Sequence, residues 1–292
     1  MTDVLGILTA YDDQLLTVRR EDGSLVTVAR RDLVTGKPIP PRASPRLRIE
    51  PEALQRICSD GLAPLETEHA GDWRLRAAGG FTRRANSTLV VGDPGLPVGA
   101  AFERVRDFYD RLDLPPMLQV VVGSDWQRTA EDHGWQIARS PDTVVQVASV
   151  AQARRSAAGQ PRTDDVVIAD SPNGAWMSLY NRAAETDAAM VRSVLQSGDA
   201  VGFATAGDAP DAIGRAVVTG DWVGFSAVEV RPAQRRHGLG SSVVEALLGW
   251  AAAHGAMSAY LQVVPDNDAA VALYRRYGFV THHAYRYLTW PA

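Results

Sequence analysis

A basic segment followed by glycines is the part of this sequence best suited to chemistry. Its seven residues are Arg235, Arg236, His237, Gly238, Leu239, Gly240 and Ser241. Glycine lets a backbone come close to a ligand, and the N–H groups at a helix start carry partial positive charge. Together with positive side chains, such N–H groups suit a phosphate-rich ligand. The segment is therefore predicted to bind phosphates, with His237 either a contact or an exposed loop residue.

The surrounding pattern places this segment between a strand and a helix. Residues Trp222 to Val230 are apolar and β-branched, which predicts a strand that Pro232 ends. Apolar residues then recur with helical spacing over 239–251. Gly220-Asp221 predicts a two-residue hairpin turn that pairs the strand with residues 212–219. The basic segment should thus lie in a loop that opens a helix.

Other ligand classes lack the residues they need. A dinucleotide loop requires a third glycine, but Ser241-Ser242-Val243 follows Gly240, and the Lys-Ser/Thr pair of an ATP loop is absent. The sequence contains no Cys-x-x-Cys, His-Glu-x-x-His or Gly-x-Ser-x-Gly. The pair His282-His283 has no carboxylate beside it, so no metal site is predicted.

The spacing Arg235-x-x-Gly238-x-Gly240 resembles the acetyl-CoA pyrophosphate loop of the GNAT acetyltransferases. A second block resembles the later helix of that family, and it reads Asn267-x-x-Ala270-x-x-x-Tyr274-x-x-Tyr277-Gly278-Phe279. The alternative is an ordinary β-α-β-α unit that ends at Gly278. The two blocks in this order imply a mixed α/β (α+β) fold, the GNAT acyl-CoA N-acyltransferase fold, over residues 163–292.

The resemblance also implies roles for individual residues, with acetyl-CoA as co-substrate and no metal. The backbone groups of Val228 and Val230 would bond the pantetheine arm, and the basic segment would hold the pyrophosphate. Tyr274 would act as general acid towards the CoA thiolate, and its alternative role is a core tyrosine. Asn267 would contact the cofactor or cap the helix that follows it.

A general base is not assigned. Members of the family often carry a glutamate on the strand before the loop, facing the substrate. Two-residue alternation places Gly224 and Ser226 on the face of Val228 and Val230, and it places Glu229 on the opposite face. The remaining candidates are Glu185, Asp187 and a water chain through Ser226.

The first part of the chain shows a different pattern. Residues 1–48 are predicted to form a small Src-homology-3-like β-barrel, with strands at 4–8, 15–18 and 25–28 and a further strand at 32–34. A structural cap is the expected role, and partner binding is the alternative. Residues 38–46 contain four prolines and are predicted to form a linker.

Residues 49–152 are predicted to be a degenerate GNAT-like α/β segment, because their strand and helix order repeats that of the C-terminal block. When Gly134-Trp135 is aligned with Gly278-Phe279, Tyr274 falls against Ala130, and Asp93-Pro94-Gly95-Leu96-Pro97 stands where the basic loop should be. The segment would extend a sheet without binding CoA; coincidental α/β similarity is the alternative. Residues 151–163 are predicted to be a linker, and 284–290 an edge strand.

Composition limits the remaining possibilities. The chain has 292 residues, a net charge of −4 and scattered basic residues, which argues against a nucleic-acid partner, including one for the basic stretch 154–162. One cysteine, Cys58, fits a reducing compartment. Neither a secretory signal nor a long apolar segment is visible, so a cytoplasmic protein without a membrane partner is expected.

The predicted function is that of an acetyl-CoA-dependent N-acetyltransferase, in which a primary amine attacks the CoA thioester directly. The alternative is a catalytically silent acyl-CoA-binding sensor or scaffold protein, which the unassigned base motivates. A small amine, an aminoglycoside-like antibiotic, a peptide N-terminus and a protein lysine all remain open as acceptors. The oligomeric state is also open, with a homodimer as one option.

Overall fold

The computed structural model describes residues 3–20, 23–36, 48–157, 166–180, 187–207 and 209–291. The chain forms two compact units, Met1–Ala43 and Ser44–Ala292. The predicted linker at 38–46 lies outside the described residues.

The first unit contains a three-stranded antiparallel sheet in strand order β1-β2-β3. Its strands are β1 (Ile7–Tyr11), β2 (Leu15–Arg19) and β3 (Leu25–Ala29). The Asp12 carboxylate closes the first hairpin by accepting the N–H groups of Gln14 and Leu15, each at 2.7 Å. This pairing confirms the strands predicted at 15–18 and 25–28, whereas the first strand, predicted at 4–8, begins at Ile7 and extends to Tyr11. Closure into a Src-homology-3-like barrel stays a prediction.

The further strand expected at 32–34 is wrong. A 3₁₀ helix, η1 (Arg30–Asp32), follows β3 instead. The Arg30 N–H donates to the Gln14 carbonyl at 2.8 Å, and the Leu33 N–H donates to the Arg30 carbonyl at 3.1 Å. These two bonds turn the chain away from the sheet directly after its third strand.

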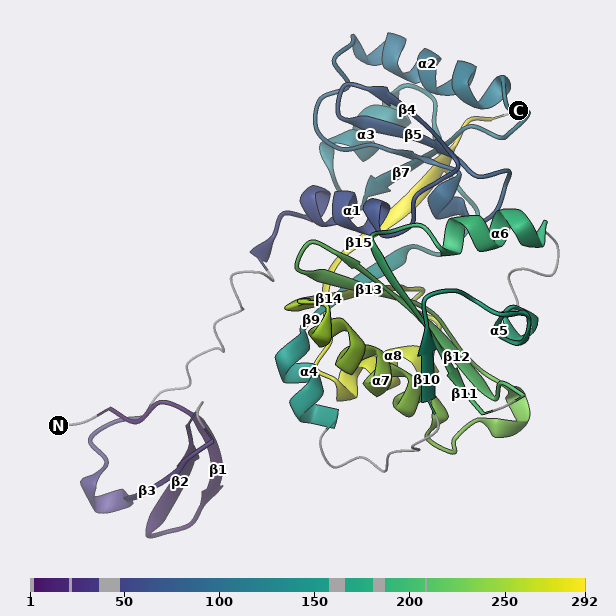
Figure 1. The fold of residues 1–292 in the computed structure, drawn as a ribbon. Helices are drawn as coiled ribbons and strands as arrows, with labels where there is room; N and C mark the ends of the chain where they lie inside the picture. The colour runs from purple at the N-terminus through teal and green to yellow at the C-terminus, as the bar shows by residue number, and fades with distance from the viewer. Residues whose placement is uncertain are drawn as a thin grey trace. The chain divides into compact units, whose positions relative to one another are not determined.

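The second unit is built on one twelve-stranded sheet over its described residues (Figure 1). The strand order is β10-β11-β12-β13-β14-β9-β15-β7-β6-β5-β4, and β8 pairs with β15. The strands are β4 (Glu66–Ala70), β5 (Trp73–Ala77), β6 (Thr88–Leu89), β7 (Met117–Val121), β8 (Gln136–Ile137), β9 (Thr143–Ser149), β10 (Val166–Ala169), β11 (Ala200–Ala206), β12 (Ala212–Thr219), β13 (Trp222–Val230), β14 (Ser258–Val263) and β15 (Val280–Thr289).

The pairing pattern repeats outward from the centre of this sheet. On one side of the antiparallel pair β9–β15, β14 is antiparallel to β9 and parallel to β13, and antiparallel strands follow. On the other side, β7 is antiparallel to β15 and parallel to β6, and antiparallel strands follow again. Each half therefore pairs with the last strand of the other, because β9 adjoins β14 and β15 adjoins β7.

Helices cover both faces of the sheet, and 3₁₀ turns lie in two of its loops. They are α1 (Pro51–Asp60), η3 (Arg83–Ala85), α2 (Val98–Asp110), α3 (Asp125–Asp132), α4 (Val150–Ala157), α5 (Gly174–Leu179), α6 (Ala188–Leu195), η5 (Pro232–Gln234), α7 (Leu239–Ala253) and α8 (Asp268–Arg276). Figure 1 shows α1 between the two halves, with α2 and α3 at one end of the unit and α4, α7 and α8 at the other.

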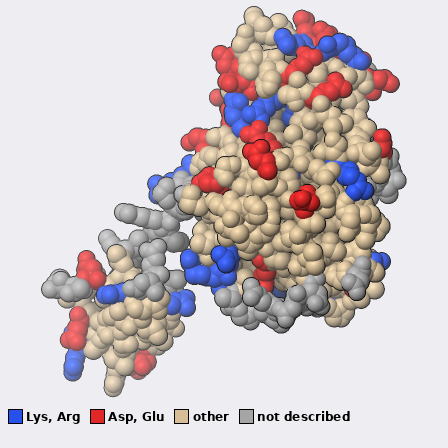
Figure 2. Space-filling model, viewed as in Figure 1, with Lys and Arg blue, Asp and Glu red and all other residues tan. Residues whose placement is uncertain are grey.

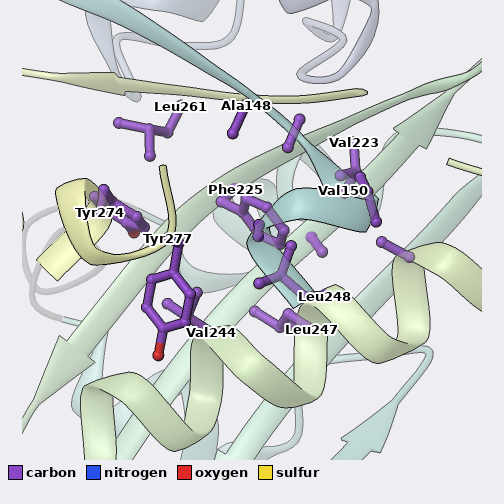
Figure 3. Packing of buried hydrophobic residues seen from close by; sticks show 14 of the residues in the cluster. Ala148, Val150, Val223, Phe225, Val244, Leu247, Leu248, Leu261, Tyr274 and Tyr277 are labelled. Atoms are coloured by element: carbon purple, nitrogen blue, oxygen red, sulfur yellow. The ribbon is translucent and has the colours of Figure 1, made fainter. Parts of the chain in front are cut away.

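The apolar core forms separate clusters on the two faces. Residues of α4, α7 and α8 pack against β11 to β14, as Figure 3 shows around Phe225 and Leu247. On the opposite face, α5 and α6 pack over Phe203 and Ile213, and α1 packs over Tyr285. We call this second side the α1 face of the sheet. It is the face on which the two halves of the unit meet.

Three sequence-based expectations fail in this unit. The segment predicted as a linker at 151–163 begins as helix α4, whose buried Val150 and Ala153 join the core; residues 158–163 lie outside the described ones. The strand predicted at an edge is β15, which lies between β9 and β7 in the sheet interior. The two edge strands are β10 and β4, and β4 was not predicted because its sequence Glu66–Ala70 is mostly polar.

Candidate functional site

The sheet opens between β13 and β14. These two strands pair in parallel from Trp222 opposite Ser258 to Phe225 opposite Leu261, and the pairing ends there. β13 continues to Val230 alongside β12 only. A gap flanked by main-chain groups therefore lies at the carboxyl ends of two parallel strands.

A β-bulge in β13 sets which side chains face this gap. Ala227 has a φ of 53°, and the register to β12 shifts between Ile213 and Arg215. Such a bulge inserts one extra residue and reverses the alternation beyond it. Val228 packs on the α7 side with Val230, as Phe225 does before the bulge.

The predicted position of Glu229 is consequently wrong. Glu229 lies opposite Ile213 and Ser226 lies opposite Arg215, and both partners are on the α1 face. Gly224 lies on the same face, where a Cβ would meet the Tyr260 hydroxyl at 2.4 Å. Glu229 thus shares a face with Gly224 and Ser226 rather than with Val228 and Val230.

The backbone groups of Val228 and Val230 point towards the gap. Arg231 N–H donates to the Asp211 carbonyl at 2.8 Å, so alternation along the antiparallel pair directs the groups of Glu229 to β12. The groups of Val228 and Val230 then point away from β12. One of them, the Val230 carbonyl, accepts a bond from Arg235 Nε at 3.3 Å.

The basic segment forms the loop between β13 and α7. After η5, Arg236 and Gly238 both adopt left-handed conformations, with φ of 65° and 87°. Successive N–H groups in such alternating conformations turn towards one side and form an anion-binding concavity. Gly238 is the N-cap of α7, and a Cβ there would meet no atom within 4 Å.

Three backbone N–H groups in the first turn of α7 precede the first hydrogen bond of the helix. In the described structure, the first bond of this ladder runs from the Ser242 N–H to the Gly238 carbonyl at 3.0 Å. The N–H groups of Leu239, Gly240 and Ser241 precede it and have no carbonyl four residues back within the helix. The helix dipole adds partial positive charge at this point.

Helix α8 contributes the second predicted block. Asn267 caps it, with its side chain accepting the Ala270 N–H at 3.1 Å. Tyr274 is 6% exposed and packs edge-on against Phe279, with ring centroids 5.4 Å apart. Burial raises the pKa of Tyr274, so its hydroxyl stays protonated at neutral pH. The Tyr274 hydroxyl makes no hydrogen bond to the residues that the structure describes.

Tyr277 has a role that the sequence did not reveal. Its hydroxyl lies 3.2 Å from the Ser241 carbonyl and 3.1 Å from Glu245 Oε1, so it ties α8 to the first turns of α7. Figure 3 shows the hydroxyl directed towards α7, beside Tyr274. Burial raises the pKa of Tyr277 to about 12. The Tyr-Gly-Phe ending of the motif was the available signal for this contact.

The other carboxylates considered as bases are placed differently. Asp187 caps α6, with its side chain accepting the Ala189 N–H at 2.8 Å, while Glu185 lies outside the described residues.

Cys58 is buried, and burial raises the pKa of its thiol. No group of three His, Cys, Asp or Glu side chains suited to a metal ion occurs among the residues described.

A surface pocket of about 410 Å³ lies elsewhere, around Asp60, His69, Arg74, Asp199 and Thr219. Thr219 precedes the hairpin turn at the start of β13, whereas the basic loop follows the end of that nine-residue strand. This pocket is therefore separate from the loop and the gap, and the geometry of the gap identifies the candidate site.

Solved structures share this architecture. A GCN5-related N-acetyltransferase from Kribbella flavida has a TM-score of 0.60 at 19% identity, covering 82% of this chain and 95% of its own. A tandem GNAT protein from the clavulanic acid biosynthesis pathway has a TM-score of 0.58 at 16% identity, covering 85% of this chain and 89% of its own. The opened sheet and the loop before α7 define an acetyltransferase of the GNAT type.

Sequence comparison identifies the family. The chain belongs to the family described as "Probable histone acetyltransferase Rv0428c C-terminal", which matches residues 52–288. The probable histone acetyltransferase Rv0428c of Mycobacterium tuberculosis is 28% identical over 303 aligned positions, covering 99% of this chain and 89% of the relative. The uncharacterized N-acetyltransferase YobR of Bacillus subtilis is 26% identical, covering 80% of this chain and 96% of the relative.

Proposed function

We propose that the chain transfers an acetyl group from acetyl-CoA to a primary amine by direct attack of the amine. The observation that carries the proposal is the set of unpaired main-chain donors at the start of α7, placed at the mouth of the gap between β13 and β14. A phosphate needs such donors, and an extended pantetheine arm needs the free strand edge of Val228 and Val230.

The residues of the loop fit the pyrophosphate in type and in conformation. The N–H groups of Leu239, Gly240 and Ser241 would bind its oxygens, with Gly238 allowing the required turn. Arg235 is already anchored to the end of β13 by its bond to the Val230 carbonyl, so its charge is held at the loop. Arg236 and His237 would contribute further contacts.

Two side chains divide the proton transfers. Glu229, on the α1 face beside the gap, would accept the proton that the attacking amine loses. Tyr274 would donate its hydroxyl proton to the CoA sulfur as the thioester bond breaks. Bound acetyl-CoA supplies the activated acyl group. Transfer yields an amide and free CoA. Loss of the proton from Glu229 to solvent and return of a proton from solvent to Tyr274 then restore both groups.

The alternative, an acyl-CoA-binding sensor without turnover, rested on the unassigned base. The bulge at Ala227 places Glu229 on the face of Gly224 and Ser226, which supports the proposal that Glu229 is this base. We therefore favour the enzyme with turnover.

The acceptor is proposed only as a primary amine. The Mycobacterium tuberculosis relative is named a probable histone acetyltransferase, so a protein lysine belongs among the acceptors to be tested. On the face drawn in Figure 2, acidic and basic side chains are interspersed over the second unit. This face offers no broad acidic surface for a basic protein.

Residues 49–152 are proposed to be a degenerate half that extends the sheet without binding CoA, beside a catalytic segment at 163–292. Carboxylates from α1 and from the turn between β4 and β5 occupy the donors of the loop that follows β6. The Gly92 N–H donates to Glu52 Oε2 and the Asp93 N–H donates to Asp72 Oδ2, each at 2.9 Å. A phosphate there would meet negative charge instead of free N–H groups.

Further properties remain predictions. They are the cap role of the N-terminal unit over residues 1–48, a cytoplasmic location, and the absence of nucleic-acid and membrane partners. No helix in the described parts of the chain is both long and apolar enough to cross a membrane.

Calorimetry with acetyl-CoA tests the proposed function. The wild-type protein should release binding heat, and Gly238→Pro should weaken binding about 100-fold, because proline cannot adopt a φ of 87° and charge-assisted bonds to the phosphates are lost. Gly249→Ala is the matched control, since it lies in the same helix and a Cβ there meets no atom within 4 Å. No heat with the wild type, or equal affinity of Gly238→Pro and the control, refutes the proposal.

Turnover is tested separately with Glu229→Gln. Removing a general base should lower kcat about 100- to 10,000-fold and leave acetyl-CoA affinity unchanged. Unchanged kcat would exclude Glu229 as the base.

A further inference from the structure

The loop between β5 and β6 extends from the first half of the unit to the acceptor side of the site. Phe81 and Ala85 from this loop are buried in one cluster with Trp176 and Tyr180 of the C-terminal half. The same cluster contains Ile213, the strand partner of Glu229. The loop therefore lies on the α1 face close to the carboxylate that we propose as the base.

The conformation of this loop is tightly specified. The buried side chain of Asn86 accepts the N–H groups of Ala78 and Gly80 at 2.8 and 2.9 Å and donates to the carbonyls of Phe81 and Thr82 at 2.6 and 2.9 Å. Thr82 has a φ of 52°, a conformation that costs a β-branched residue free energy. The strained residue directly precedes Arg83 and Arg84.

Arg84 carries a positive charge on the α1 face. Its side chain is half-buried, and among the residues that the structure describes its guanidinium makes neither an ion pair nor a hydrogen bond. The groups that interact with it electrostatically are Tyr285, Tyr287, Tyr180 and Cys58. None of these neighbours carries a negative charge at neutral pH.

The other buried arginines differ from Arg84, because their donors are used within the protein. Arg215 donates to the carbonyls of Leu195, Gly61 and Ser197 at 2.6 to 3.1 Å. Arg76 donates to Ser87, Ser59 and Gln119 at 2.8 to 3.1 Å. Arg215 and Arg84 also interact unfavourably with one another. Of these three arginines, Arg84 is the one whose guanidinium makes no hydrogen bond to the described residues.

Two buried polar atoms on the same face also lack partners. The Tyr285 hydroxyl, in a fully buried side chain, and Gln262 Oε1 make no hydrogen bond within the described structure. Tyr285 belongs to the cluster under α1, and Gln262 pairs with Val145 of that cluster. Gln262 directly follows Leu261, the last residue of β14 that pairs with β13. Native proteins rarely leave buried polar atoms without hydrogen-bond partners, so these two atoms are candidates to bind a polar ligand.

We propose that Arg84 binds an anionic group of the acceptor, so that the substrate is an amine that also carries a carboxylate or a phosphate. The inference rests on the proposed function. The amine would lie at the gap beside Glu229, and the anionic group would take the donors of Arg84, with the Tyr285 hydroxyl as a further donor. A guanidinium matches either oxyanion in a two-point contact. This acceptor class differs from a lysine in a strongly basic protein segment.

Binding to the protein alone tests the site without requiring turnover. The probes are 4-acetamidobutyrate, which keeps a carboxylate, 3-acetamidopropylphosphonate, which carries a phosphate-like group, and N-butylacetamide, which carries neither. Calorimetry should show that an anionic probe binds at least tenfold more tightly than N-butylacetamide. Comparison of the two anions distinguishes a carboxylate from a phosphate acceptor.

Variants then assign the effect to one residue. Arg84→Met should weaken binding of the anionic probe about 10- to 100-fold, because a charge-assisted bond is lost, and should change that of N-butylacetamide less than twofold. Arg83→Met, an exposed neighbour on the same loop, should leave both unchanged. Arg84→Lys should recover part of the affinity and also serves if Arg84→Met does not fold. Melting curves establish that each variant is folded.

The acetylation assay adds a second readout. The ratio of kcat/KM for 4-aminobutyrate to that for butylamine should exceed ten in the wild type and fall towards one in Arg84→Met. The inference is overturned if the wild type binds the charged and uncharged probes equally, or if neither anionic probe gives binding heat. It is also overturned if the enzyme acetylates a lysine-rich peptide in preference to every anionic amine. The proposed function fails by a different result, the absence of heat with acetyl-CoA itself.

Discussion

A chain of side-chain hydrogen bonds crosses the junction between α1 and the sheet. It runs from Arg76 through Gln119, Gln55, His283 and His282 to the Ile49 carbonyl. Its successive distances are 2.9, 2.6, 2.7, 2.7 and 2.9 Å. Arg76 can only donate, so it fixes the direction of every bond that follows. In this arrangement Nε2 of His283 accepts from Gln55, Nδ1 of His283 donates to Nδ1 of His282, and Nε2 of His282 donates to the Ile49 carbonyl.

This arrangement disfavours protonation of His283. Burial, followed by the nearby His282, lowers the pKa of His283 to about 4 from an ordinary 6.5. If Nε2 of His283 were protonated, its N–H would point at the N–H of the Gln55 side-chain amide, and two donors would face each other. Rotating that amide by 180° would remove this clash, but its NH₂ group would then face the NH₂ group of Gln119. As the pH falls from 6.5 towards 4, the unfolded state binds more protons than the folded state. The free energy of unfolding therefore decreases over this window.

Gln55→Glu tests the reasoning. The lowering of the pKa from 6.5 to about 4 corresponds to at most about 3.5 kcal/mol, because one pKa unit is worth about 1.4 kcal/mol. His283 is half-buried, so solvent screening leaves about 1–2 kcal/mol. A carboxylate at position 55 can accept from both Gln119 and a protonated His283, which raises the pKa of His283 and removes this acid-dependent loss.

Thermal unfolding from pH 8 to pH 4.5 measures the effect. The wild type should lose about 2–8 °C of Tm through this histidine, at about 2–4 °C per kcal/mol. Gln55→Glu should be less stable than the wild type at pH 8, and the difference should shrink or reverse by pH 5. Gln152→Glu, on the exposed side of α4, is the control and should follow the wild type. Parallel curves for Gln55→Glu and the wild type would refute the assignment.

Three further substitutions have expected outcomes. Arg215→Met should lower the free energy of unfolding in urea by about 2–4 kcal/mol, because the buried carbonyls of Gly61 and Leu195 lose their donors; a loss under 1 kcal/mol would contradict this. Tyr274→Phe should lower kcat about tenfold or more without changing urea unfolding, since its hydroxyl has no partner in the described structure, and an unaltered kcat would make it a core residue only. Tyr277→Phe should cost about 1–2 kcal/mol of stability, measured in the same urea titration, and an unchanged midpoint would show that its bond to α7 contributes little.

Local patterns in the sequence were sufficient to predict the strand, loop and helix of the cofactor side. Trp222 to Val230 contains three valines and two aromatic residues, which favour a strand, and the glycines at 238 and 240 mark the loop before α7. The cap at Asn267 also follows from residue type, because asparagine is a strong helix starter. These features depend on residues close together in the chain, which a pattern can report.

The acceptor side could not be derived in the same way. The bulge at Ala227 has no glycine or proline to mark it, yet it decides the face on which Glu229 lies. Arg84 is more than 140 positions from Glu229 along the chain and reaches the same face through tertiary packing alone. The interior position of β15 was missed because alternating side chains suggested one solvated face, whereas both of its faces are covered by helices.

The exchange of final strands between the two halves has a consequence for synthesis. Strand β7 obtains its second neighbour, β15, only when residues 280–289 have emerged from the ribosome, and until then β9 also has an unpaired edge. A growing polypeptide that includes β4 to β9 therefore exposes unpaired backbone donors and acceptors until β15 is synthesised. Nascent chains with such exposed strand edges associate with one another or recruit chaperones.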